Sequence, residues 1–178
     1  MPLVVFLRGV NVGGHKRFQP SLLVRELGHL GLVNIGAAGT FVVREAVGRT
    51  ALRTELLRKL PFDAELMVCD GSDLIKLAAA DPFPRESVGK DVRRFVSVLA
   101  KQPRKPPPLP LDQPAGARWE VKVVGISGIF ALSLWRRMGR TFLDPNGIVE
   151  KNFGVSATTR NWNTIIKIRD LLIEGARR

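Results

Sequence analysis

Reactive side chains are scarce in this chain of 178 residues, which has no tyrosine, one cysteine, two histidines and three tryptophans. A lone cysteine forms no internal disulfide, and with two histidines it makes too small a set for a typical zinc site. We therefore expect neither a metal nor a cofactor. Because Cys69 lies in an apolar run, we expect it to be a buried thiol.

Long apolar runs are also missing. The N-terminal run from Pro2 to Leu7 is too short for the core of a signal peptide, and no run approaches the roughly 20 residues that cross a membrane. These absences predict a soluble, cytoplasmic protein with no membrane partner. They leave its oligomeric state open.

Familiar catalytic patterns are absent as well. Ser127 in GISG and Ser156 in GVSAT both lack the second glycine of the GxSxG motif. Asp63 and Glu65 fall on one face of an expected strand, where solvated charge is the simpler explanation. His15 is the one residue whose position and titration range suit proton transfer, but a solvated histidine is the commoner case. Catalytic residues therefore stay unknown.

Positive charge is abundant and uneven. The chain has 28 Lys and Arg against 16 Asp and Glu, and residues 90–178 hold 17 of the former and 7 of the latter, a net of +10. A contiguous basic surface would bind nucleic acid weakly, without sequence preference and with steep salt dependence. A solvated surface that only supports solubility is the alternative. The candidate nucleic-acid-binding residues are Arg93, Arg94, Arg104, Lys105, Arg136, Arg137 and Arg140.

Apolar periodicity predicts an α+β fold whose first domain covers residues 1–80. Strands are expected at 2–7, 33–35, 40–44 and 65–69, and helices at 20–31 and from Thr50 to residue 60. This β-α-β-β-α-β order is that of ferredoxin-like domains. A further helix, capped by Ser72, is expected to end near residue 80.

The second half predicts another small α+β domain, over residues 85–178. Strands are expected at 92–99, 118–124 and 129–135, a turn at 144–147, and a last helix from about Asn161 or Trp162. The proline-rich segment 103–114 is expected to be an extended loop. A solvated spacer is the simpler interpretation of this loop, and docking of a partner is the alternative.

The stretch LRGVNVGG, Leu7 to Gly14, reads as a strand that enters a glycine-rich loop. Glycines allow positive φ and close approach of a ligand, and the following helix start favours an anion. The spacing fits neither GxGxxG nor GxxxxGK[ST], so a bulge that only redirects the chain is the alternative. The candidate ligand-binding residues here are Arg8, Gly9, Asn11, Gly13, Gly14 and Lys16.

The stretch TTRNWNT, Thr158 to Thr164, supplies a second set of candidates, namely Arg160, Asn161, Trp162 and Asn163. Its asparagines are able to cap a helix start while the tryptophan anchors the turn. Alternatively, the guanidinium holds a carboxylate or phosphate and the amides bind a planar group. We expect the two motifs to meet in one site for an anionic small molecule or nucleotide.

The two motifs together resemble an uncharacterised bacterial family, domain of unknown function 1697. The resemblance extends through LRTELLRKL and the DPFP of Asp81 to Pro84 to TTRNWNTIIKI, which ends at Ile168. Family members usually carry a Gln-Ser-Gly-Asn type of turn where this chain has Ala37, Ala38, Gly39 and Thr40, so an altered site is conceivable. The resemblance implies no activity. An anion-binding protein or enzyme, a nucleic-acid-binding module and a non-catalytic interaction protein all remain open.

Overall fold

The computed structural model describes residues 2–11, 14–84, 89–139 and 142–176. The chain divides into two compact units, one formed by Met1–Ala79 with Ile166–Arg178 and the other by Ala80–Ile165. We call them unit 1 and unit 2. The sequence assigned 166–178 to the second domain, whereas the structure groups this segment with unit 1. The physical reason is packing, because the side chain of Leu172 lies against Gly71.

Unit 1 follows the expected β-α-β-β-α-β order. Its four strands form one antiparallel sheet in the order β2-β3-β1-β4. The ferredoxin-like label remains an interpretation of this order. The elements are β1 (Leu3–Leu7), α1 (Pro20–Glu26), the 3-10 turn η1 (Gly28–Leu30), β2 (Leu32–Asn34), β3 (Thr40–Val43), α2 (Arg49–Lys59), β4 (Leu66–Asp70) and α3 (Gly71–Ala79).

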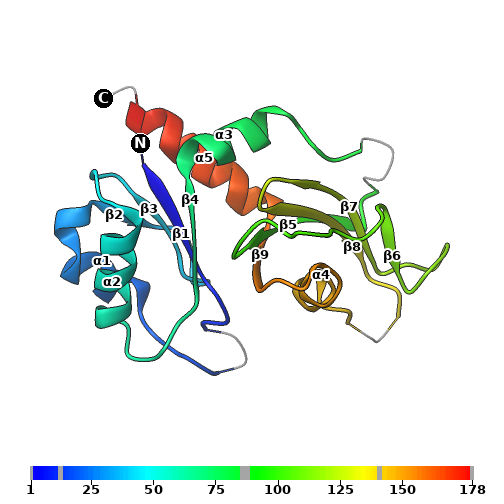
Figure 1. Ribbon diagram of the computed structural model, residues 1–178, viewed down its shortest axis with the longest axis horizontal. Coiled ribbons are helices and arrows are strands. Elements are labelled where there is room, and N and C mark those ends of the chain that lie inside the picture. The colour runs from blue at the N-terminus through cyan, green and yellow to red at the C-terminus, as the bar shows by residue number, and fades with distance from the viewer. Residues whose placement is uncertain (1, 12–13, 85–88, 140–141, 177–178) are drawn as a thin grey trace. The chain divides into compact units, whose positions relative to one another are not determined.

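Both faces of this sheet are buried. Leu3, Val5 and Leu7 share one core with leucines of α1 and α2, whereas Val4 and Phe6, on the opposite face, are 0% exposed. Figure 1 shows α1 and α2 on one side of the sheet, and α3 with α5 (Trp162–Ala176) on the other. This two-sided burial explains why β1 reads as an unbroken apolar run instead of an alternating one.

Of two helix ends predicted in unit 1 from local sequence signals, one is confirmed and one is wrong. Gly31 ends the η1 turn in the left-handed conformation, as the sequence suggested. The predicted cap at Thr50 was wrong, because α2 begins at Arg49 with Gly48 as its N-cap. Thr50 instead lies inside the first turn, where its carbonyl accepts a hydrogen bond from the Thr54 hydroxyl.

Unit 2 contains a five-stranded antiparallel sheet in the order β6-β7-β8-β5-β9. Helix α4 covers one face, and its Val149 and Phe153 pack with Leu99, Val123 and Ala157 of the sheet. The elements are β5 (Val92–Leu99), β6 (Leu111–Gln113), β7 (Val121–Ser127), β8 (Phe130–Arg136), α4 (Pro145–Phe153), β9 (Ala157–Asn161) and the start of α5.

Three elements of unit 2 correct the sequence-based expectation. The turn expected at 144–147 is the start of α4, which has Asp144 as N-cap, Pro145 at its first position and Gly154 as its left-handed stop. Part of the expected 103–114 loop forms β6, which pairs with β7. Residues 157–161 form β9, because the β-branched Thr158 and Thr159 continue the sheet beside β5.

Candidate functional site

A cavity of about 760 Å³ lies beside the glycine-rich loop of unit 1, and we call it the loop pocket. It opens where the loop after β1 approaches the start of α1 and the turn between β2 and β3. Among the described residues, its walls are Asn11, Gly14, Arg17, Phe18, Gln19, Pro20, Ser21 and Ala37. Of this set, Asn11 and Gly14 were predicted as ligand contacts from the sequence.

The side chain of Asn11 bonds to two other segments of unit 1. Its side-chain amide donates to the Ala37 carbonyl at 2.8 Å and to the Phe18 carbonyl at 3.3 Å, while its Oδ1 accepts from the Phe18 N–H at 3.0 Å. The residue has a φ of +53°, a conformation that asparagine tolerates better than most side chains. Asn11 is therefore a pocket wall whose polar atoms already bond to the protein backbone.

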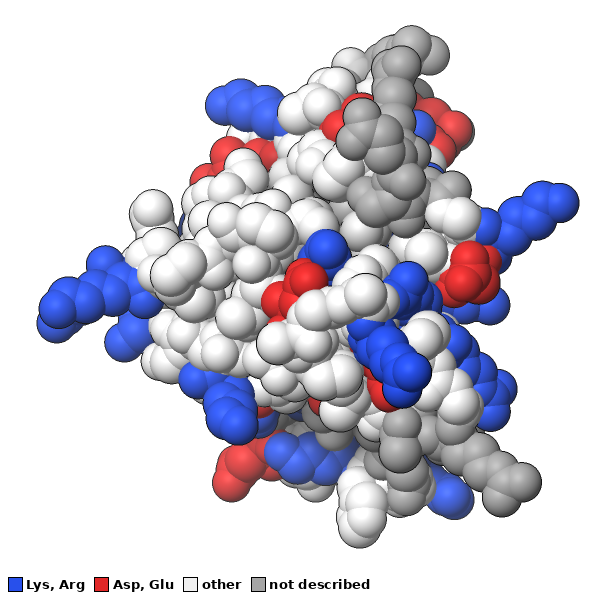
Figure 2. Space-filling model, turned by 90° about the vertical axis from the view of Figure 1, so that its right-hand side faces the viewer, with Lys and Arg blue, Asp and Glu red and all other residues white. Residues whose placement is uncertain are grey.

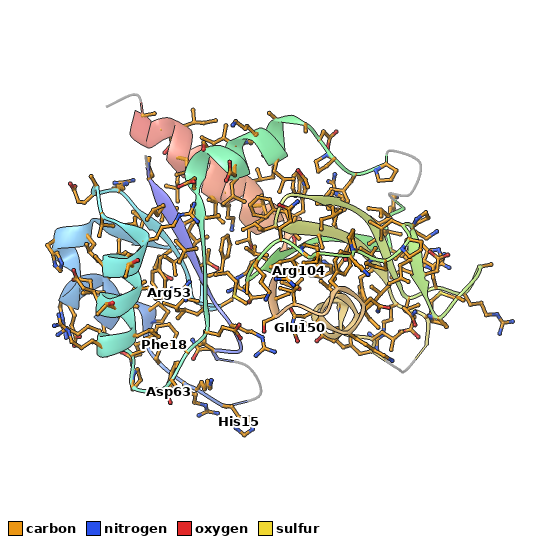
Figure 3. The ribbon with its side chains drawn as sticks, in the orientation of Figure 1. His15, Phe18, Arg53, Asp63, Arg104 and Glu150 are labelled. Carbon is orange, nitrogen blue, oxygen red and sulfur yellow. The ribbon has the colours of Figure 1, made fainter. Side chains whose placement is uncertain are left out.

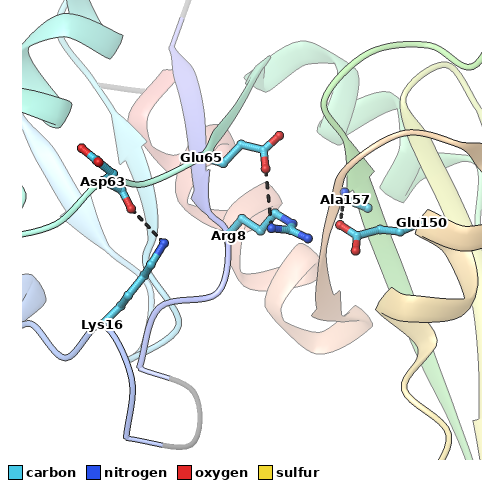
Figure 4. Close-up of polar contacts among 6 residues, drawn as sticks. All are labelled: Arg8, Lys16, Asp63, Glu65, Glu150 and Ala157. Carbon is cyan, nitrogen blue, oxygen red and sulfur yellow. Dashed lines mark hydrogen bonds and ion pairs between the residues drawn. The ribbon is translucent and has the colours of Figure 1, made fainter.

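Two of the predicted cations are likewise engaged within unit 1. Nη1 of Arg8 lies 3.6 Å from Oε2 of Glu65, and Nζ of Lys16 donates to the Asp63 carbonyl at 2.8 Å (Figure 4). The Lys16 ammonium also lies 5.9 Å from the centre of the Phe62 ring. These contacts hold both side chains outside the set that lines the loop pocket.

Arg17 is the cation of the loop pocket. Its side chain is exposed, and among the described residues it has neither a hydrogen bond nor an ion pair. A Cβ added to Gly14, which has a φ of +81°, would lie 3.1 Å from the Arg17 guanidinium. Gly14 thus leaves the space that this guanidinium occupies.

The turn between β2 and β3 forms another wall of the loop pocket. Gly39 has a φ of +70°, and a Cβ there would lie 2.8 Å from side-chain atoms of both Leu7 and Val10. Glycine is therefore required at this position for two independent reasons. Ala37, at the cavity wall, offers only a methyl group, so the turn contributes no side-chain hydrogen bond to the pocket.

A second cavity of about 420 Å³ adjoins the loop pocket and shares Arg17, Phe18 and Gln19 with it. We call it the apolar extension. Its remaining walls are Leu22, Leu23, Glu26, Lys59, Leu60 and Pro61. The Lys59 ammonium lies 3.6 Å from Glu26, so these two charges pair with each other, and the other four of these described walls are apolar.

The second motif, residues 158–164, lies in unit 2. Arg160 is 7% exposed and donates through Nη1 to the Thr158 hydroxyl at 2.8 Å and to the Thr159 carbonyl at 3.0 Å. Burial lowers the pKa of Arg160 to about 10, so the guanidinium stays charged at neutral pH. A buried cation of this kind needs its hydrogen-bonding partners for stability.

The other residues of this motif have clear structural contacts. Oδ1 of Asn161 accepts from the Asn163 N–H at 2.9 Å, which caps the start of α5. Trp162 is 5% exposed and packs edge-on against Phe83, with ring centres 5.1 Å apart. Asn163 itself is exposed. The structural interpretation of this motif thus accounts for Asn161 and Trp162.

The two motifs belong to different units, and their meeting in one site stays a prediction. Gly13, a predicted ligand contact, lies outside the described residues, as does Arg140 of the basic set. Gly9 has a φ of +66° and open space around it. The walls Arg17, Phe18, Gln19 and Ser21 were not among the predicted site residues. For Arg17, the available signal was its positive charge next to the glycine-rich loop.

The basic residues of unit 2 differ in how they are used. Arg136 stacks on Trp119, with its Cζ 4.1 Å from the ring centre, and donates to the carbonyls of Trp119 and Ala117. Arg94 lies over Phe83 at 5.7 Å. On the face that Figure 2 shows, Lys and Arg side chains stand in several groups with uncharged surface between them.

Neither His15 nor Cys69 is among the described walls of the loop pocket. His15 is exposed and is not a wall of the loop pocket; Figure 3 labels it near the end of the loop. Burial raises the pKa of the Cys69 thiol to about 12. In the described part of the chain, no group of three His, Cys, Asp or Glu is arranged to hold a metal, and no helix is long and apolar enough to cross a membrane.

The comparison with known families matches residues 1–126 to the model of a protein family of unknown function, DUF1697. The chain belongs to this family. The match includes the glycine-rich loop and ends before the 158–164 motif. This result confirms the family inferred from the sequence motifs.

A solved structure has the same fold. It is described as the conserved bacterial protein SP0830 from Streptococcus pneumoniae, with a TM-score of 0.60 and 17% sequence identity. The alignment covers 96% of this chain and 98% of the other. No curated protein matches the chain. The comparisons therefore give a family and a fold, without an activity.

Proposed function

We propose that this DUF1697 protein binds a small molecule with an anionic group in the loop pocket of unit 1, with Arg17 as the cation that holds it. The observation that carries the proposal is the state of Arg17. It lines a cavity of about 760 Å³ and has no protein partner among the described residues. A planar guanidinium in this state is suited to bidentate binding of a carboxylate or phosphate.

The rest of the loop supports a pocket that exists before the ligand arrives. Asn11 connects the loop to the chain at Phe18 and Ala37 through three hydrogen bonds. Pocket walls held in this way at Asn11, Phe18 and Ala37 lose little conformational entropy on binding, which favours affinity. Gln19 and Ser21 line the same cavity and offer neutral donors and acceptors to the polar part of the ligand.

The apolar extension indicates the form of the ligand. Because Arg17, Phe18 and Gln19 line both cavities, an anionic group at Arg17 places the remainder of a molecule beside Phe18, Leu22 and Pro61. A small ligand that joins an anionic group to an apolar or aromatic body fits this arrangement best. Nucleotides are one class of this kind.

A thermal-shift screen with nucleotides, phosphorylated metabolites and aromatic carboxylates tests the proposal. A ligand that binds only the folded protein adds about 2.7 kcal/mol to the free energy of unfolding at a concentration of 100 times its Kd. This added stability raises the melting temperature. The Arg17→Gln variant should lose this shift while keeping the melting temperature of the free protein. Arg53→Gln, an exposed arginine on α2 labelled in Figure 3, is the matched control and should keep the shift.

Three results would overturn the proposal. One is a screen without any stabilising ligand, which favours a non-catalytic interaction protein. Another is a ligand whose shift is equally strong in wild type and Arg17→Gln, which places its binding elsewhere. A shift lost in both Arg17→Gln and Arg53→Gln would indicate general charge attraction instead of a site.

A further inference from the structure

Unit 2 contains a cavity of its own, of about 500 Å³, between the loop that follows β5 and the end of α4. Its walls are Lys101, Gln102, Arg104, Lys105, Phe153, Gly154 and Val155. Figure 3 labels Arg104 in this region. We call it the basic pocket. It shares no described residue with the loop pocket, so binding at the basic pocket does not involve Arg17.

Three of the seven described walls are cations, and none of the seven is a carboxylate. Within the described part of the chain, Lys101, Arg104 and Lys105 have no ion pair and no hydrogen bond, and all three are exposed. Like charges held near one another repel, and a bound anion relieves that repulsion. This set differs from Arg94 and Arg136, whose guanidinium groups lie against aromatic rings.

The loop that carries these cations is stiff. Pro103, between Gln102 and Arg104, is buried, and Pro106, Pro107 and Pro108 follow Lys105 directly. Each proline ring fixes its φ, which restricts the backbone on both sides of the cations. Leu109 then packs against the α4 core and anchors the far end. The backbone that carries the three cations is therefore restricted before any ligand binds.

The floor of the basic pocket is the end of α4. Phe153 and Val155 are nearly buried, and Gly154 between them has a φ of +63° with open space where a Cβ would stand. Helix carbonyls at this end carry about half a negative charge, which opposes anion binding. Three full positive charges outweigh that half charge, so the net attraction is for anions.

We propose that the basic pocket binds closely spaced phosphate groups. Three neighbouring cations on a stiff loop match several adjacent negative charges better than a single one, because a lone anion satisfies only part of the set. Two sources have this chemistry, namely a free oligophosphate and the backbone of a nucleic acid. The cavity, its charge and its stiffness do not depend on the function proposed for the loop pocket.

Titration of the full-length protein with inorganic triphosphate and, separately, with a twelve-residue thymidine oligonucleotide at 50 mM salt tests this proposal. The double variant Arg104→Gln/Lys105→Gln should weaken binding by tenfold or more. The control Lys90→Gln/Arg118→Gln removes the same charge from exposed positions of unit 2 outside the pocket. It should change the affinity for either probe less than threefold. Circular dichroism and melting temperature verify that both variants fold.

The pattern of binding distinguishes the two sources. Triphosphate that binds without competition from the oligonucleotide assigns the pocket to a free oligophosphate. An oligonucleotide that displaces triphosphate, with affinity that falls steeply between 50 and 200 mM salt, assigns it to nucleic acid. Both results support the site, and in both Arg17→Gln should bind triphosphate as wild type does.

Three results would overturn it. The first is no binding of either probe at 50 mM salt. The second is an equal loss in the pocket variant and the control, which would indicate charge attraction without a site. The third is a loss in Arg17→Gln with unchanged binding to the pocket variant, which would place triphosphate in the loop pocket and leave the proposal for that pocket intact.

Discussion

The two pockets carry the same kind of charge in different states. In unit 1 the loop that follows β1 has several cations, but Arg8 pairs with Glu65 and Lys16 donates to the Asp63 carbonyl, which leaves Arg17 at the cavity. In unit 2 a stiff loop presents three cations with no carboxylate among the walls of its pocket. The number of positive residues near a loop therefore says less than the number that lack a partner.

The net charge of each unit also differs from the net charge of each half of the sequence. The two halves of the sequence carry net charges of +2 and +10. Unit 1, which includes residues 166–178, has 14 Lys and Arg against 9 Asp and Glu, a net of +5, and unit 2 has 14 against 7, a net of +7. Much of the difference in net charge between the two halves thus resulted from dividing the sequence at residue 90 instead of at the unit boundaries.

The largest effect is expected at the turn that walls the loop pocket. Gly39→Ala should cost about 3 kcal/mol or more of unfolding free energy, because the new Cβ meets Leu7 and Val10 at 2.8 Å and the φ of +70° is unfavourable for alanine. Urea denaturation measures the loss. Gly36→Ala, in the same turn with a φ of +74° but open space, should cost only about 1 kcal/mol. Equal costs would mean that contact with Leu7 and Val10 is unimportant.

A smaller effect compares the asparagines of the two motifs. Asn11→Ala should lower the free energy of unfolding by about 2 kcal/mol. The variant loses three hydrogen bonds to the backbone, and alanine tolerates the positive φ at this position less well than asparagine does. Asn161→Ala should cost about 1 kcal/mol, because it removes one helix cap. Chemical denaturation of both variants gives the difference. A cost at Asn161 that equals or exceeds that at Asn11 would reverse the comparison.

The buried thiol gives a pH-dependent effect of similar size to the helix cap. Burial raises the pKa of Cys69 to about 12, from an ordinary value of 9.0, so between these values the unfolded chain ionises and the folded one does not. The stability linked to this group is complete below pH 9 and declines as pH rises above it. Cys69→Ala should therefore lower the free energy of unfolding by about 1 kcal/mol less at pH 10 than at pH 7. An unchanged cost would show that the thiol is hydrated in the folded protein.

Local signals predicted the first unit well. Pro20 opened α1, Gly31 closed η1, and the β-α-β-β-α-β order followed from short apolar segments. Helix α4 was missed although Asp144, Pro145 and Gly154 are the usual residues at its ends, because the segment between them is short and was read as a turn. Strand β9 was missed because its threonines and asparagine also suit helix capping.

For the candidate site, the sequence pointed to the glycine-rich loop but did not reveal the contacts of its side chains. The glycine-rich loop does border a cavity, yet the side chains of Arg8, Asn11 and Lys16 bond to residues 47 to 57 positions away or to backbone that no local pattern identifies. Only the folded chain shows that, among the described residues of this loop, Arg17 is a cation without a partner at the cavity. For the same reason Lys101, Arg104 and Lys105 stood out from the other basic residues only when their contacts were known.

The most direct test of this account measures two ligands on two variants. Calorimetric titration of phenyl phosphate, which joins an anion to an aromatic ring, should give weaker binding to Arg17→Gln than to wild type and unchanged binding to Arg104→Gln/Lys105→Gln. Inorganic triphosphate should show the opposite pattern. If both ligands lose affinity equally in both variants, the two pockets are not separate anion sites and the account is contradicted.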